Sequence, residues 1–227
     1  MAARPLTRTE ASRAVEHLGW RYVLGSLRAA VAVADLEQAV EALAAVVRRC
    51  GPVGAGHLTP TPRGDRLDLA LQTPDAATVT GRDVELAEEV TGVLRELGLE
   101  TAPGGRARSV QVLEIAVDAL DIARIRPFWK AVLGYTDEPG YDGPTDALVD
   151  PLREGPAVWF QQMDEPRPQR NRIHLDISVP HDEADARIRA ALDAGGVLVS
   201  DARARAFWVL ADAEGNEVCI TTWQDRD

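Results

Sequence analysis

The 227-residue sequence has two cysteines, a single lysine and no long hydrophobic run. Cys50 and Cys219 lie far apart, so the chain has no disulfide framework and suits a reducing compartment. Runs such as AAVAVA and VQVLEIAV are too short to cross a bilayer, and the N-terminus lacks the apolar core of a secretory signal. We therefore expect a cytoplasmic protein without a membrane partner.

The chain is also short of basic residues, with 25 against 36 acidic ones and a net charge of −11. Affinity for nucleic acid comes largely from cationic side chains that displace counterions from phosphates, so we expect no nucleic-acid partner. Hydrophobic residues make up 45% and charged residues 27% of the chain, which is typical of a folded globular protein. The length suffices for two domains.

The first half of the chain alternates helical and strand-like patterns. Thr7 and Glu10 form a capping box at the start of a helix, and residues 21–33 and 65–73 alternate as strands do. A second helix carries large apolar residues on one stripe: Leu36, Val40, Leu43 and Val47. The order is helix, two strands, helix, two strands, helix. It predicts an α+β fold with helices on one face of an antiparallel sheet.

The second half contains an internal repeat. Residues 113–135 have the pattern of a strand, a helix and a glycine stop, and residues 173–196 repeat it. Three strand-like stretches follow the second copy and two follow the first, so each copy predicts a βαβββ module. Two such modules side by side offer a concave sheet surface to a small molecule.

The boundary between the halves falls in a segment with one proline and paired glycines, residues 98–109. We expect a first domain at residues 1–99, a linker at 100–108 and a second domain at 109–227.

One motif in the first half is similar to a family signature. Thr73-Pro74-Asp75 followed by VTGRDVELA resembles the C-terminal signature of pterin-4a-carbinolamine dehydratases (4a-hydroxytetrahydrobiopterin dehydratases), which is T-H-D followed by L-T-x-x-D-x-x-L-A. The paired histidines of that family fall on Gly56 and His57. The resemblance covers residues 5–99. It implies a dehydratase-like fold, a pterin-like ligand, and His57 and Asp75 as catalytic residues.

Dehydration of a carbinolamine requires a proton for the leaving hydroxyl and the removal of a proton from the neighbouring ring nitrogen. Imidazole suits both steps because its pKa lies near neutrality. Of the histidine positions in the family, only His57 carries one here, since Gly56 and Pro74 occupy the others. A single histidine also suits a surface or hydrogen-bonding role. We interpret Asp83 as the capping partner of Thr80.

The second half resembles the vicinal oxygen chelate superfamily, which includes glyoxalase I, bleomycin-resistance proteins and extradiol dioxygenases. The motifs are FWKAVLGY, residues 128–135, and DAEGNEVCI, residues 212–220. NRIHLDISV and GPAVWFQQMDEP are similar to the glyoxalase-like branch. The resemblance covers residues 109–224 and implies paired βαβββ modules.

Metal-using relatives place ligands at the start of the first strand and on the last strand of each module. The matching positions are Glu114, His174, Trp159 and Cys219. Tryptophan does not bind metals, and Glu114 with His174 is too small a ligand set. Cys219 would complete a three-ligand set, but thiols at such positions are commonly buried core. We therefore expect no resident divalent metal.

We instead expect the second domain to have an apolar surface that binds a planar ligand. The ligand-binding candidates are Trp159, Gln161, His174 and Trp208. Ordinary sheet core is the alternative interpretation for the aromatic residues.

Three functions remain open. The favoured hypothesis is a binding protein for a heterocycle or planar metabolite, derived from a dehydratase fused to a glyoxalase-like domain, with degenerate catalytic sites. The alternative is an active hydro-lyase with His57 as proton shuttle, or a glyoxalase/dioxygenase-superfamily activity in the second domain. The third is an oligomerisation or regulatory module. Because the first domain offers a sheet edge and a helix face, we expect a homo-oligomer.

Overall fold

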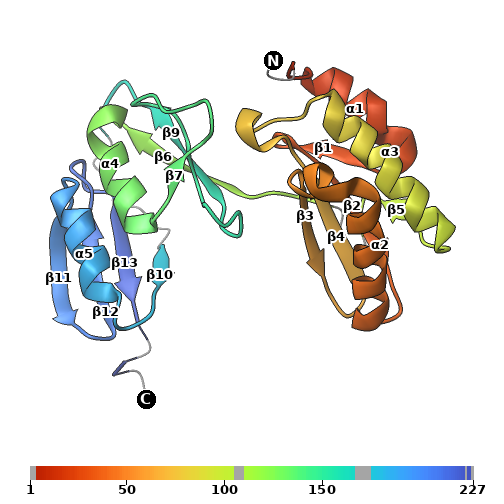
Figure 1. Ribbon diagram of the computed structural model, residues 1–227. Helices are drawn as coiled ribbons and strands as arrows, with labels where there is room; N and C mark the ends of the chain where they lie inside the picture. The colour runs from red at the N-terminus through yellow and green to blue at the C-terminus, as the bar shows by residue number, and fades with distance from the viewer. Residues whose placement is uncertain (1–3, 105–109, 167–174, 223, 226–227) are drawn as a thin grey trace. The chain divides into compact units, whose positions relative to one another are not determined.

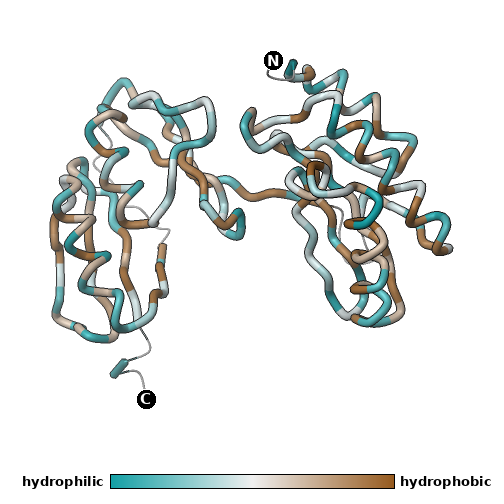
Figure 2. The backbone as a smooth tube through the Cα atoms, viewed as in Figure 1, coloured by the Kyte–Doolittle hydropathy of each residue, from teal (hydrophilic) through white to brown (hydrophobic). Residues whose placement is uncertain are grey.

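The computed structural model describes residues 4–104, 110–166, 175–222 and 224–225. It consists of two compact units, Met1–Val112 and Leu113–Asp227, each built from helices and strands (Figure 1). In both units the helices mix hydrophilic and hydrophobic residues along their length, as helices with one buried side do (Figure 2). Within the described residues, none of the helices has the length and apolar character that crossing a membrane requires.

The first unit has the predicted order of elements, with two short 3-10 helices and a fifth strand in addition. Its helices are α1 (Arg8–Val15), η1 (Glu16–Leu18), α2 (Leu36–Ala55), η2 (Pro74–Ala76) and α3 (Gly81–Glu96). Its strands are β1 (Arg21–Val23), β2 (Ser26–Ala32), β3 (Leu58–Pro62), β4 (Arg66–Leu71) and β5 (Thr101–Ala102). The strands pair antiparallel in the order β1-β2-β4-β3, and β5 lies beside β2.

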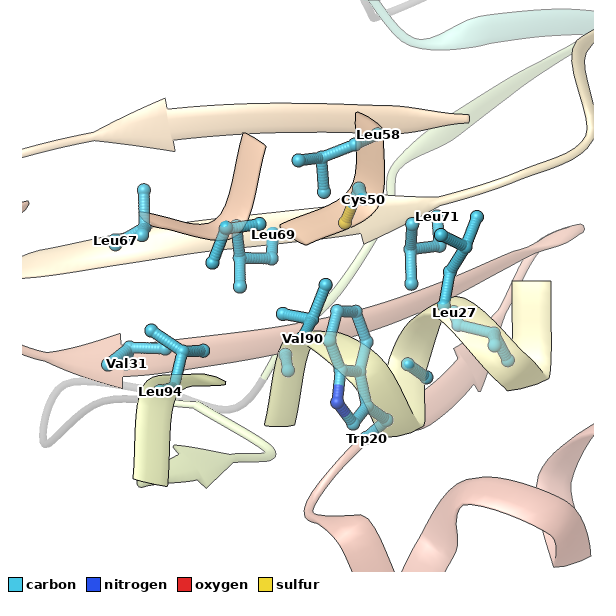
Figure 3. Packing of buried hydrophobic residues seen from close by; sticks show 14 of the residues in the cluster. Trp20, Leu27, Val31, Cys50, Leu58, Leu67, Leu69, Leu71, Val90 and Leu94 are labelled. Atoms are coloured by element: carbon cyan, nitrogen blue, oxygen red, sulfur yellow. The ribbon is translucent and has the colours of Figure 1, made fainter. Parts of the chain in front are cut away.

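The core of the first unit lies between this sheet and the helices. Leu67, Leu69 and Leu71 alternate along β4, and all three are buried. Figure 3 shows them in one hydrophobic cluster with Val90 of α3 and with Trp20. The alternation predicted for residues 65–73 is therefore confirmed, and it places the helices on one face of the sheet.

Helix α2 buries a different side from the one that its large residues suggest. The buried residues are Ala39, Ala42, Val46, Cys50 and Gly54. Of the predicted apolar stripe, Leu36 and Val40 are each 52% exposed and Val47 is 42% exposed, while Leu43 is only partly buried. Small side chains on the buried side allow a helix axis to lie close to a sheet, and the larger stripe then stays at the surface.

The second unit contains the two predicted βαβββ modules. The first consists of β6 (Glu114–Ala119), α4 (Ile122–Leu133), β7 (Thr136–Asp137), β8 (Leu148–Val149) and β9 (Ala157–Gln162). The second consists of β10 (Asp176–Ser178), α5 (Ala184–Asp193), β11 (Val197–Arg203), β12 (Phe207–Ala211) and β13 (Glu217–Thr221). The sheets have the equivalent orders β6-β9-β8-β7 and β10-β13-β12-β11, with the first strand parallel to the last in each. This equivalence confirms the internal repeat.

The two modules share one core. A single hydrophobic cluster contains Val117 and Phe128 of the first module together with Ile188, Leu210 and Ile220 of the second. Helices α4 and α5 lie side by side (Figure 1). The repeat therefore forms one folded unit with a common interior.

The turn between β12 and β13 joins the modules by hydrogen bonds. Asp212, which is 2% exposed, accepts a bond of 2.9 Å from the Trp129 indole of α4. The Glu214 carboxylate accepts bonds of 2.7 and 2.6 Å from the backbone N–H groups of Leu120 and Asp121, at the start of α4. The acidic residues of the DAEGNEVCI motif thus satisfy donors of the other module, including helix-start N–H groups that have no partner inside the helix.

Both cysteines lie in the cores. Cys50 in α2 is 6% exposed and Cys219 in β13 is 1% exposed. Burial, with smaller contributions from the charges of Asp176 and Glu217, raises the pKa of Cys219 to about 11. Burial, followed by the charge of Glu89, also raises the pKa of Cys50. Neither thiol has the lowered pKa that marks a reactive cysteine.

Replacing Glu214 with alanine removes the carboxylate that holds the start of α4. We expect the Glu214→Ala variant to lose about 1.5–3 kcal/mol of unfolding free energy, the usual worth of a hydrogen bond to a charged group. Urea denaturation of the full chain measures the loss. The exposed Glu154→Ala is a matched control in the same unit and should leave the midpoint unchanged. Equal midpoints for both variants would contradict the role of Glu214.

The raised pKa of Cys219 predicts slow alkylation. The thiolate is the reactive form, so a pKa near 11 leaves roughly a hundredfold less of it at neutral pH than an ordinary thiol has. The rate of iodoacetamide labelling at Cys219, followed by mass spectrometry, should be low in the native protein and rise sharply in urea. Similar rates in the two conditions would show that the thiol is accessible and not shifted.

Candidate functional site

Three segments of the first unit meet beside the start of α3. Gly51, with a φ of 64°, interrupts α2, and residues 52–55 form a last turn that leads to His57, the residue before β3. The backbone of His57 accepts a hydrogen bond of 3.0 Å from Gln72 N–H at the end of β4. Thr73, next in the chain, pairs with Thr78 in an isolated bridge that returns the chain to α3.

Asp83 is the centre of this site. It lies in the first turn of α3 and is fully buried. Its Oδ1 atom lies 2.8 Å from Nδ1 of His57. Its Oδ2 atom accepts hydrogen bonds from the Thr73 hydroxyl at 2.6 Å, the Thr80 backbone N–H at 2.7 Å and the Thr80 hydroxyl at 3.2 Å. Four donors therefore surround one carboxylate, as a buried charge requires.

This arrangement fixes how His57 can exchange protons. A carboxylate only accepts hydrogen bonds, so Nδ1 carries a hydrogen, and in the neutral ring Nε2 presents its lone pair. The His57 side chain keeps 15% of its surface exposed, and among the described residues none bonds to Nε2. A ring held at one nitrogen and available at the other is the arrangement of a general base with an orienting acid.

The sequence predicts only part of the role of Asp83. The capping box of Thr80 and Asp83 is confirmed. The sequence does not predict the bond to His57, although one clue exists: a cap uses one carboxylate oxygen, and the second oxygen of a buried aspartate needs a donor of its own. His57 meets that need from 26 residues upstream.

Asp75 and the two substituted family positions lie at the surface. Asp75 is exposed on η2, and within the described residues it forms no hydrogen bond with His57. The carboxylate that contacts the imidazole is that of Asp83. Gly56 and Pro74 are exposed as well. The catalytic role predicted for Asp75 stays a prediction.

In the second unit, Trp159 and Gln161 lie on the sheet face that we call the outer face, the one directed away from α4. Their neighbours Val158 and Phe160 point into the core, and the alternation of β9 turns Trp159, 37% exposed, and Gln161 outward. Ala116 of β6 is the cross-strand partner of Trp159, and Glu114, also exposed, lies two residues before it. Two of the four ligand-binding candidates thus share one accessible face.

The other candidates lie elsewhere or outside the described residues. Trp208 is opposite Ile220 and packs against the core cluster, in keeping with its interpretation as sheet core. His174 lies outside the described residues. Cys219 is buried opposite Asp176.

The described residues contain no group of three or more His, Cys, Asp or Glu side chains suited to a metal ion. Of the weak ligand candidates Glu114, His174 and Cys219, His174 lies outside the described residues, so the expectation of no resident divalent metal stays a prediction. The Cys219 thiol, with its pKa raised to about 11 by burial and by acidic neighbours, is a poor thiolate donor as it stands.

The comparisons with known proteins agree with both sequence resemblances. Residues 4–93 match the family model of pterin 4 alpha carbinolamine dehydratase, and residues 114–221 match that of the glyoxalase-like domain. No curated protein matches the chain.

Several solved structures are similar to parts of the chain. A transcriptional coactivator/pterin dehydratase from Brucella melitensis has 21% identity over 40% of this chain and 98% of that one, with a TM-score of 0.36. A glyoxalase/bleomycin resistance protein/dioxygenase family enzyme from Burkholderia phytofirmans has 17% identity over 48% of this chain and 95% of that one, with a TM-score of 0.39. A fosfomycin resistance protein from Mesorhizobium loti has 10% identity over 50% of this chain and 92% of that one, with a TM-score of 0.39.

The two family models cover adjacent, non-overlapping parts of the chain, one in each compact unit. The chain therefore joins a pterin carbinolamine dehydratase-like domain to a glyoxalase-like domain of the vicinal oxygen chelate type.

Proposed function

We propose that the first domain binds a planar heterocycle of the pterin class and eliminates water from its carbinolamine form, with His57 as the proton shuttle. The observation that carries this proposal is the bond between His57 Nδ1 and the fully buried Asp83. A histidine with only a surface role has no need of an enclosed carboxylate. Here three further donors hold that carboxylate in place.

In the proposed reaction, His57 Nε2 carries out both proton transfers. His57 Nε2 takes the proton from the ring nitrogen next to the carbinol carbon, and the electron pair of that N–H bond forms the C=N bond. The C–O bond breaks, and the proton returns from Nε2 to the departing hydroxyl, which leaves as water. Asp83 stabilises the imidazolium between the two transfers. The histidine ends in its starting state, so no further reactant is consumed.

The substituted positions set the expected rate. Gly56 and Pro74 supply no acid or base, and a missing acid–base group typically slows a reaction by about 10²–10⁴-fold. We therefore expect slow turnover. The same two positions support the alternative, in which the first domain binds the heterocycle without converting it.

For the second domain we propose that the outer face binds a planar small molecule. An indole that is 37% exposed beside the amide of Gln161 combines a stacking surface with a group that fixes orientation. His174 is the proposed further contact. Trp208 is not part of this proposal because it packs against the core.

We also propose that the protein is a cytoplasmic homo-oligomer. Two buried thiols without a disulfide suit a reducing compartment. The exposed apolar stripe of α2 supports self-association.

Two substitutions test the proton shuttle. His57→Ala removes the base, and turnover of a pterin carbinolamine, followed by absorbance of the quinonoid product, should fall by about 10²-fold or more. Asp83→Asn keeps the shape of the side chain but removes its charge, so we expect a loss of at least about tenfold in kcat with a smaller change in KM.

His17→Ala, which removes an exposed histidine of η1, is the matched control and should leave turnover unchanged. If the wild-type chain binds the pterin but shows no turnover, the binding alternative replaces the enzyme. If His57→Ala turns over like wild type, the proposal is wrong.

Trp159→Ala tests the second site. Native mass spectrometry of the purified full chain should detect a co-purified small molecule on the wild type and not on the variant, because the stacking surface is lost. The thermal midpoint should not change, since the indole lies outside the core. Leu152→Ala, at a position that is 74% exposed, is the control. Retention of the small molecule by Trp159→Ala would rule out this face.

A further inference from the structure

We propose that the sheet of the first domain carries an anion site on the side turned away from the helices, where Arg28, with Arg21 beside it, binds the phosphate group of a small molecule. The proposal uses neither His57 nor the outer face of the second unit. It therefore goes beyond the proposed function, and each proposal can fail without the other.

The two arginines are neighbours on adjacent strands. Leu27, Ala29 and Val31 of β2 point into the core, so Arg28 points to the opposite side of the sheet, which we call the far face. Arg21 of β1 is the cross-strand partner of Arg28, so both side chains start from the far face, with Cβ atoms about 5 Å apart. Like charges directly opposite one another destabilise a strand pair. The pair is therefore unfavourable unless a negative charge offsets it.

Ser26 holds the Arg28 guanidinium at one nitrogen. The Ser26 hydroxyl is 5% exposed and donates a hydrogen bond of 2.9 Å to the Val23 carbonyl. Its oxygen accepts a bond of 3.0 Å from Arg28 Nε. Among the described residues, the two Nη groups of Arg28 have no acceptor. A guanidinium fixed at Nε with its Nη groups available is suited to two oxygens of one phosphate group.

The charge of Arg28 is not neutralised by the protein. Arg28 is half-buried, and burial lowers the pKa of its guanidinium, while the charge of Asp68 acts in the opposite direction. Asp68 is already engaged, because it pairs with Arg63 at 3.1 Å and with Arg66 at 2.9 Å. Within the part of the chain that the structure describes, no carboxylate forms an ion pair with Arg28 or Arg21.

Arg126 of the second unit shows how this protein satisfies an enclosed arginine. It is 7% exposed, and it donates to the Asp137 carboxylate at 2.6 Å and to the Asp146 carbonyl at 2.7 Å. The chain has 36 acidic residues against 25 basic ones, so acidic partners are not scarce. A half-buried arginine without a carboxylate is costly, and a bound anion removes that cost.

The positions of the two guanidiniums favour a doubly charged anion. Arg21 Nη1 donates to the Trp20 carbonyl at 2.7 Å and to the Glu16 carbonyl at 3.2 Å, whereas Arg28 is held by Ser26. The two cations are thus anchored at different acceptors, with no negative charge between them. A phosphate monoester carries up to two negative charges at neutral pH and offsets both, whereas a carboxylate offsets one.

The total charge favours a small molecule over a polyanion. Nucleic acids and anionic membranes are bound by many cationic side chains at once, and a net charge of −11 opposes both. Two guanidiniums suffice for one phosphate group.

The first test is a titration of inorganic phosphate with the full chain at constant ionic strength, followed by phosphorus NMR. Wild type should bind in the millimolar range, and Arg28→Gln should weaken binding at least about tenfold, because charge-assisted hydrogen bonds are lost. Arg49→Gln removes the same charge from an arginine that pairs with Glu96, and it should leave the affinity unchanged. A wild type that does not bind, or equal affinities for Arg28→Gln and wild type, overturns the proposal.

A second variant separates recognition from folding. Arg28→Lys keeps the charge and a long stem but loses the planar fork, so its affinity for phosphate should fall between those of wild type and Arg28→Gln. Phosphate should raise the thermal midpoint of wild type and have less effect on both variants. If both variants lower the midpoint in the absence of phosphate, and phosphate does not stabilise wild type, Arg28 has a structural role and the proposal is wrong.

Two further measurements identify the source of the phosphate group. Acetate at the same ionic strength should bind more weakly than phosphate, and equal binding contradicts the preference for a doubly charged anion. In sedimentation with vesicles of phosphatidylcholine and phosphatidic acid, the protein should stay in the supernatant. Retention on these vesicles that depends on Arg28 would assign a lipid headgroup and overturn the small-molecule ligand.

Discussion

The candidate site of the first domain depends on one enclosed charge, the carboxylate of Asp83. A carboxylate removed from water must be surrounded by donors, and each donor must come from a segment held at the right place. The cap of α3, the end of β4 and the residue before β3 are therefore linked through one side chain. The orientation of His57 follows from the need to satisfy this charge.

The same constraint explains how the site differs from a full dehydratase signature without losing its structure. Gly56 and Pro74 lie at the surface, where their side chains are not needed by the fold. His57 and Asp83 belong to the network that closes the start of α3. A substitution at the two surface positions leaves this network intact, whereas a substitution at His57 or Asp83 removes hydrogen bonds that stabilise the fold.

Much of the fold follows from the sequence because local signals agree with it. The capping boxes at Thr7 and Thr80, the alternation of β4 and the strand–helix–glycine order of both modules all appear in the structure. The sequence does not predict which side of α2 is buried. Hydrophobicity alone favours burial of the stripe of large residues, whereas close approach of the helix to the sheet favours burial of the alanines. The bond of His57 to Asp83 joins residues 26 positions apart, a distance at which no periodicity applies. Likewise, Trp159 and Trp208 have similar sequence surroundings, and only strand register separates an outer from a core indole.

The turn from Asp212 to Asn216 has a consequence for how the second domain unfolds. Asp212 and Glu214 of this turn accept hydrogen bonds from Trp129 and from the start of α4. The hairpin of β12 and β13 therefore stabilises α4, the first helix of the domain. Neither half of the duplication keeps a complete set of partners once the other is lost. The two modules therefore form a single cooperative unit, in which loss of structure in either module destabilises the other.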